Sequence, residues 1–140
     1  MGLKSFFQFL GLVAGFSFQA QTLHLYGGAD QDQYLGCLNC DNFDKTSIWN
    51  KFSDYGNAFS SKSIWNRYGN YGSTHSTYSP WNAYGAYPPK IVDQDGNFFG
   101  FFTGNPYQSE RSELELAVIL YQHHEEIKND VGGWYEKLFR

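Results

Sequence analysis

The sequence predicts an α+β fold in which a small antiparallel sheet and one long C-terminal helix pack around loop-rich aromatic repeats. Three observations lead to this prediction. A tetrad containing Trp and Asn recurs every 16 residues, starting at Ser47, Ser63 and Ser79. An Asp-Gly turn separates two apolar runs between residues 90 and 103, which is a strong signal for a β-hairpin. A run without Gly or Pro covers residues 114–128 and has the apolar periodicity of a helix.

Residues 1–20 have the composition of a secretory signal peptide. Lys4 is their only charged residue, an apolar run covers residues 5–18, and the small side chain of Ala20 precedes Gln21. An N-terminal membrane anchor is the alternative, but the run is shorter than the ~20 residues that a membrane-spanning helix needs. We therefore expect cleavage after Ala20, a single domain over residues 21–140, no membrane span in the mature chain, and a secreted or periplasmic location.

Two short strands are expected directly after this leader. Residues 22–26 alternate between polar and apolar side chains and end at a Gly-Gly pair, and residues 33–38 form a second run of this kind. The predicted hairpin, over about residues 90–103, supplies two more strands and turns at Asp93 to Asn97. A calcium loop at this acidic turn is rejected, because Ile91 and Phe102 would occupy the first and last ligand positions.

Cys37 and Cys40 are the only cysteines of the chain, and their spacing has three interpretations. In an oxidising compartment they would form a disulfide, which closes a small loop and stabilises the fold by about 2 kcal/mol. They could instead form a thioredoxin-like redox centre, although the repeats occupy the place of that fold's helices. A zinc site would need two further ligands, and the four histidines show no recognisable ligand spacing. We expect no metal and no cofactor.

The repeats cover about residues 43–87 and preserve several positions besides the tetrad. Each copy is too short to be a domain and leaves room for a short strand or helical turn joined by tight turns. With fewer than three complete copies, the repeats must pack on the hairpin and the helix to bury their apolar side chains. The equivalent aromatic positions are Trp49, Trp65 and Trp81; Phe52, Tyr68 and Tyr84; Tyr55, Tyr71 and Tyr87; and Phe43, Phe59 and His75.

We expect the Trp column to form the core, and a ligand-binding ladder is the alternative if this column is exposed. The neighbouring Asn residues offer amide groups to sugar hydroxyls, and the Tyr columns tolerate one side in water. His75 is interpreted as one ring that replaces another in a packed column, in preference to a Ser-His catalytic pair. The candidate ligand-binding residues are Asn50, Asn66, Asn82, Tyr55, Tyr68, Tyr71, Tyr84 and Trp65.

The long helix is expected over about residues 112–128. Ser112 and Glu115 have the spacing of a capping box, and the apolar residues that follow form a stripe that should lie against the sheet. His123 and His124 are interpreted as a solvated or dipole-facing pair near its C-terminal end, in preference to a metal or acid–base site. A last short helix is expected over residues 134–139.

Composition restricts the classes of partner. The formal net charge is −4 for the whole chain and −5 for residues 21–140, because residues 1–20 carry one lysine and no acidic residue. The basic residues are scattered, whereas a nucleic-acid partner requires a clustered basic face, so we expect no nucleic-acid binding. Aromatic residues make up 20% of the chain, which favours dense aromatic packing or a surface for flat, weakly charged partners such as sugars.

Residues 34–40, the tetrads, residues 88–93 and residues 96–100 together resemble a widespread bacterial family of small exported proteins. A similar module follows thermonuclease-like domains in some Gram-positive proteins, so the resemblance implies an accessory role. It implies no catalytic residue. The first copy departs from the pattern, because Phe52-Ser53 stands where the other copies have Tyr-Gly.

The function expected from the sequence is non-catalytic binding at the cell envelope or outside the cell. The chain contains no nucleophile elbow, phosphate-binding loop or dinucleotide fingerprint, so we assign no catalytic residue. Glycan, peptidoglycan or another exported protein is the expected partner. The alternative is thiol–disulfide exchange at Cys37 and Cys40.

Overall fold

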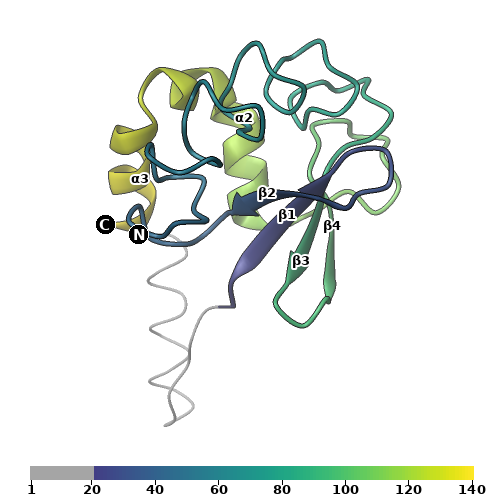
Figure 1. The fold of residues 1–140 in the computed structure, drawn as a ribbon. Helices are drawn as coiled ribbons and strands as arrows, with labels where there is room; N and C mark the ends of the chain where they lie inside the picture. Colours follow the sequence, from purple (N-terminus) through teal and green to yellow (C-terminus); the bar gives the residue numbers. More distant parts are fainter. Residues whose placement is uncertain (1–20) are drawn as a thin grey trace, which may run out of the picture.

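The computed structural model describes residues 21–140, and the predicted signal peptide lies outside the described residues. Figure 1 shows a small sheet and two helices connected by long irregular loops. This is the predicted α+β class. Neither helix within residues 21–140 has the length and apolar character of a membrane span. The elements, in chain order, are β1 (Leu23–Gly27), β2 (Gln33–Cys37), β3 (Lys90–Asp93), β4 (Phe98–Phe101), α2 (Glu115–Asn129) and α3 (Val131–Phe139).

The sheet has the strand order β2-β1-β3-β4, and all three pairings are antiparallel. β2 ends at Cys37 and β3 begins at Lys90, so the aromatic segment leaves the sheet at its edge and returns beside the central strand β1. The sheet contributes Leu25, Leu35 and Ile91 to the core, all fully buried. Both ends of the aromatic segment are therefore held by the sheet.

The β1–β2 pair contains an irregularity where the first repeat copy approaches the sheet. The register shifts between Leu25 and Tyr26, opposite Gly36, whose φ of 110° is readily adopted only by glycine. A Cβ atom on Gly36 would lie 2.7 Å from the Cβ of Tyr55. Gly36 thus permits close contact between β2 and the first copy.

β3 and β4 form the hairpin that the Asp-Gly turn predicts. Asp93 organises the turn, because its Oδ1 accepts hydrogen bonds from the backbone N–H groups of Asp95 and Asn97, each at 2.9 Å. Its Oδ2 accepts a third bond from the Asn97 side chain at 2.9 Å, and these bonds, the Asn97 side chain first, lower the pKa of the Asp93 carboxyl. Strand pairing ends at Phe101, earlier than the predicted boundary at residue 103.

Helix α2 begins at Glu115, three residues later than the capping-box pattern predicts. Ser112 does not form the predicted capping box. Its backbone N–H, which the Glu115 side chain would accept from in that motif, donates to the carbonyl of Phe101 at 2.8 Å beside β4, and its hydroxyl accepts from the N–H of Leu114 at 3.4 Å. The N-cap position belongs to Leu114, whose side chain makes no capping hydrogen bond. Pairing with the sheet thus takes Ser112 out of the helix.

Three buried tryptophans form a row in the core of the protein. Trp49, Trp65 and Trp81 are 3%, 1% and 3% exposed, and the centroids of neighbouring rings are 5.7 Å apart. Each indole N–H donates at 2.7 Å to a backbone carbonyl earlier in the chain. The acceptors are the carbonyls of Leu38, Ile48 and Ile64, respectively. The tryptophan row is therefore core, and no ring face in it is open to a ligand.

The two helices and Phe102, which directly follows β4, close the ends of the tryptophan row. At one end Trp49 contacts Tyr135 of α3, with 5.9 Å between ring centroids, and Figure 1 shows α3 beside the dark teal loop that follows β2. At the other end Trp81 stacks on His124 of α2 at 4.8 Å and meets Phe102 edge-on at 5.2 Å. The apolar interior of the repeats is thus completed by elements outside them.

We predict that Trp65→Phe lowers the free energy of unfolding by about 2–4 kcal/mol, because it leaves the buried Ile48 carbonyl without its donor and opens a small cavity. Urea unfolding followed by circular dichroism measures this change. Tyr107→Phe is the control, since Tyr107 is 92% exposed, and it should change the stability by less than about 0.5 kcal/mol. Equal stabilities of the two variants would show that the indole bond contributes nothing.

Candidate functional site

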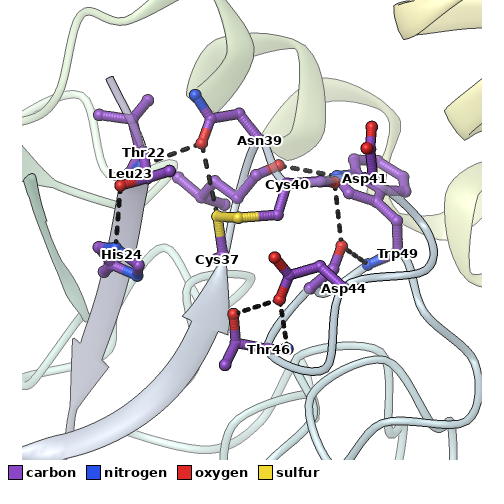
Figure 2. Close-up of a disulfide and its surroundings, with 12 residues drawn as sticks. Thr22, Leu23, His24, Cys37, Asn39, Cys40, Asp41, Asp44, Thr46 and Trp49 are labelled. Carbon is purple, nitrogen blue, oxygen red and sulfur yellow. Dashed lines mark hydrogen bonds between the residues drawn. A yellow bond between two sulfur atoms is a disulfide. The ribbon is translucent and has the colours of Figure 1, made fainter. Parts of the chain in front are cut away.

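Cys37 and Cys40 form a disulfide where β2 ends and the aromatic segment begins (Figure 2). Their Cα atoms are 5.6 Å apart, within the usual range for a disulfide. Cys37 is fully buried and Cys40 is half-buried. The structure therefore contains the first of the three forms considered for this pair.

The turn that the disulfide closes is bonded both to the sheet and to the first copy. The N–H of Leu38 donates to the carbonyl of Leu23 in β1 at 2.8 Å, and the Asn39 side chain accepts from the N–H of Leu23 at 2.9 Å. On the other side, the Ser47 hydroxyl donates to the carbonyl of Cys40 at 3.1 Å. The disulfide thus secures a junction between β1 and the repeats.

The surroundings of the bridge do not favour a reactive thiolate. A redox cysteine pair needs an accessible thiol whose pKa is lowered by a helix N-terminus or a nearby cation. Cys37 is buried, and turns, not a helix, follow Cys40. Figure 2 shows the carboxylates of Asp41 and Asp44 close to the bridge, and anions disfavour a thiolate. Burial also lowers the pKa of the nearby His24, which favours its neutral ring.

The three candidate asparagines form a ladder of identical hydrogen bonds. The Nδ2 groups of Asn50, Asn66 and Asn82 donate to backbone carbonyls six residues earlier, at 3.0, 3.0 and 3.1 Å. Their Oδ1 atoms accept from the backbone N–H two residues later, each at 3.0 Å. The carboxamides are therefore supports of the backbone, and they position the aromatic residues that follow them. We call these contacts the asparagine ladder.

Three other candidate residues are covered by the protein itself. Trp65 is 1% exposed, as described above. Tyr55 is half-buried and meets Tyr34 of β2 edge-on, with 5.0 Å between ring centroids. Tyr71 is half-buried against the core and Tyr78. Burial raises the pKa of Tyr71, so its phenol stays protonated at neutral pH. These residues stabilise the fold and offer little surface to a ligand.

Two of the candidates, Tyr68 and Tyr84, lie fully on the surface. They form with Phe52 a set of equivalent rings that we call the ring column. The exposed fractions of Phe52, Tyr68 and Tyr84 are 84%, 92% and 95%. Each follows an asparagine of the ladder by two residues. Phe52 is absent from the sequence-based set of candidates, although it occupies the same position in its copy.

A second set of equivalent rings is also exposed, contrary to the packed column predicted from the sequence. Phe43 and Phe59 are 83% and 88% exposed, and His75 is exposed as well. Phe59 and His75 lie at turns in which their backbone N–H groups bond to Asn57 Oδ1 at 2.8 Å and Ser73 Oγ at 3.1 Å. The buried Ile and Trp side chains fill the interior, so no space remains there for these rings. We call them the second ring column.

A local sequence signal for this exposure exists. Outside the ring column, Phe59 follows Asn57 and Tyr107 follows Asn105 by two residues, and in both cases the Asn Oδ1 accepts from the N–H of the ring residue. Such Asx turns belong to surface loops. The pattern Asn-x-aromatic therefore marks outward-facing rings in these turns, whereas the 16-residue period alone does not distinguish an inward from an outward position.

Charged groups of α2 attach the helix to the second copy. Arg67 donates to Glu125 at 2.6 Å and to Asn129 at 2.7 Å. The Lys128 side chain is 1% exposed, and its Nζ donates to the carbonyl of Gly72 at 2.8 Å. The bond from Arg67 lowers the pKa of the Glu125 carboxyl, and burial lowers that of the Lys128 ammonium. Arg67, Glu125 and Lys128 thus hold α2 against the second repeat copy.

His124 is not the solvated residue that the sequence suggested. Its ring stacks on Trp81, and burial, followed by the charge of Lys128, lowers its pKa. The neighbouring His123 lies at a kink of α2, stacks on Trp134 at 5.0 Å and contacts Glu126 at 2.9 Å. His124 is covered, contrary to the prediction, because its ring packs on the outer face of Trp81 at the end of the tryptophan row.

Within residues 21–140, no cluster of His, Cys, Asp and Glu side chains has the arrangement of a metal site. No protein-family model, curated protein or solved structure matches the chain. The features that bear on function are therefore the disulfide turn, the asparagine ladder and the two ring columns.

We predict that removing the disulfide with the double substitution Cys37→Ala and Cys40→Ala lowers the free energy of unfolding by about 2 kcal/mol, because the closed loop is small. The variant should remain folded. Urea unfolding with and without a reducing agent measures the change, and the reductant should destabilise only the wild-type protein. Reduction of insulin by the wild-type protein would contradict a purely structural bridge.

We predict that the stability of the protein falls as the pH is lowered from about 7 to 5. The folded-state pKa of His124 lies below its unfolded value of about 6.5, so its contribution is present above that value and is lost as the pH falls through the folded pKa. His124→Phe keeps a flat ring against Trp81 and should reduce the pH dependence, leaving the part due to His24. Unfolding midpoints at several pH values test this, and parallel curves would refute it.

Proposed function

We propose that this protein is an exported, non-catalytic binding module of the cell envelope or extracellular space, and that the ring column is its contact surface for glycan. The observation that carries the proposal is the exposure of Phe52, Tyr68 and Tyr84, at 84%, 92% and 95%. Large rings in a regular surface array are costly to keep in water and mark interaction sites. Peptidoglycan is the glycan that an envelope location favours.

Rigid support makes these rings suitable for binding. Each ring residue is held through its backbone N–H by a ladder asparagine whose own side chain is tethered six residues back. Little conformational entropy of the backbone is therefore lost on binding. Flat, preorganised aromatic faces suit the C–H faces of sugar rings, and a phenol adds a hydroxyl that bonds to water or to a sugar hydroxyl.

The disulfide supports the location that we propose. Such bridges persist in oxidising compartments, and Cys37 and Cys40 form one at a structural junction. The predicted signal peptide and the resemblance to small exported proteins favour the same compartment and an accessory role. The buried position of Cys37 gives no support to the alternative of thiol–disulfide exchange.

We predict that the double variant Tyr68→Ser, Tyr84→Ser binds insoluble cell-wall polysaccharide about tenfold or more weakly than the wild-type protein, because two stacking contacts are lost. Co-sedimentation with purified polysaccharide measures the bound fraction. Tyr107→Ser is the matched control, since Tyr107 is 92% exposed and follows an Asx turn but lies outside the repeats. The proposal would be refuted if the wild-type protein did not bind, or if Tyr107→Ser lost as much binding as the double variant. Binding to another exported protein, without binding to polysaccharide, would assign the surface to protein docking.

A further inference from the structure

We infer that the ligand of the ring column is an extended, β-1,4-linked polysaccharide that runs across the three repeat copies and contacts successive rings. This inference rests on the proposed function and adds the shape, the linkage and the direction of the ligand. It follows from the equivalent placement of the rings in successive copies, from the second ring column that borders the same ladder, and from the residues that flank the ring column.

The three positions of the ring column are equivalent in structure as well as in sequence. The bonds that support Phe52, Tyr68 and Tyr84 have the same partners in each copy and lengths of 3.0, 3.0 and 3.0 Å. The copies follow one another along the tryptophan row, where ring centroids are 5.7 Å apart at both steps. We therefore expect the equivalent rings on successive copies to follow one another in the same direction. A ligand that uses all three rings must therefore be extended and periodic.

The second ring column borders the same asparagine ladder. The carbonyls that accept from the ladder belong to Asp44, Ser60 and Ser76, each directly after one ring of the second column. One ring therefore precedes every ladder bond and one follows it. In every copy, the amide and carbonyl groups of the ladder thus lie between one ring of each column along the chain.

The ring column carries no cluster of basic residues. Tyr84 lies between Ala83 and Gly85, which have no charge. Arg67, next to Tyr68, forms an ion pair with Glu125. Beside Phe52, the cation of Lys51 lies over the ring at 5.3 Å, and Asp54 follows with the opposite charge. Contacts with the rings, and not attraction to a clustered charge, must therefore supply most of the binding.

These features select a class of polysaccharide. Equatorial β-1,4 linkages produce a straight ribbon whose sugar rings present C–H faces at a regular interval, as a row of aromatic rings requires. α-1,4-Linked chains curve away from a straight line. A monosaccharide or disaccharide has only one or two rings and cannot occupy the whole column. Affinity should therefore increase with chain length, because each added contact is made within one complex.

The test uses soluble oligomers of β-1,4-linked N-acetylglucosamine, titrated into the full mature chain and measured by calorimetry. We expect the affinity to rise about tenfold or more from the disaccharide to the hexasaccharide and then to level off once all rings are covered. Tyr84→Ser removes the ring at one end of the column. It should lower the affinity at the plateau, and the plateau should begin at a shorter oligomer. Tyr107→Ser should change neither the plateau affinity nor the length at which the plateau begins. Circular dichroism verifies that both variants are folded.

Two outcomes separate the failure of this inference from the failure of the proposed function. If the wild-type protein binds the oligomers without dependence on length, or binds α-1,4-linked glucose oligomers of equal length as tightly, the extended ligand is refuted and glycan binding stands. If it binds neither these oligomers nor cell-wall polysaccharide, both proposals are refuted.

Discussion

The hydrogen bond from each tryptophan indole to a carbonyl earlier in the chain is the constraint on which the rest of the structure depends. The indole nitrogen of Trp65 lies 2.7 Å from the carbonyl oxygen of Ile48, and that of Trp81 lies 2.7 Å from the carbonyl oxygen of Ile64. Each bond thus places one tryptophan against the turn of the preceding copy. Each copy is also tightly turned within itself, since a Cβ atom on Gly72 would overlap the carbonyl of Asn66 in the same copy. The indole bonds satisfy buried carbonyls that loop-rich structure would otherwise leave unpaired.

The filled interior explains why so many rings face water. Ile48, Ile64 and the three tryptophans occupy the core of the repeats, so the remaining aromatic positions lie either against the sheet, as Tyr55 does, or outside. The asparagine ladder then holds the outer rings in place. The buried core and the exposed ring column, which we propose as the binding surface, thus depend on the same tetrad, because its Trp points inward while its Asn supports the next ring outward.

The repeats depend on the sheet, the helices and the disulfide for their ends. Tyr135 covers Trp49 at one end and His124 covers Trp81 at the other, and the Cys37–Cys40 turn joins the first copy to β1. Three short copies cannot bury two open ends by themselves. The histidine in this role is a consequence of packing, and its lowered pKa follows from that burial.

The sequence by itself determined the α+β class, the hairpin at Asp93 to Asn97 and the spacing of the copies, and it favoured a buried tryptophan column while leaving an exposed ligand ladder open. Only the tertiary structure decided that Phe43 faces solvent, that the ladder asparagines are supports, and that α2 begins after Ser112. The physical reason is that a 16-residue period applies equally to inward and outward positions of a turn. The Asn-x-aromatic turns indicate some of the outward rings, but the start of α2 depends on contacts with a distant segment, such as the bond from Ser112 to Phe101.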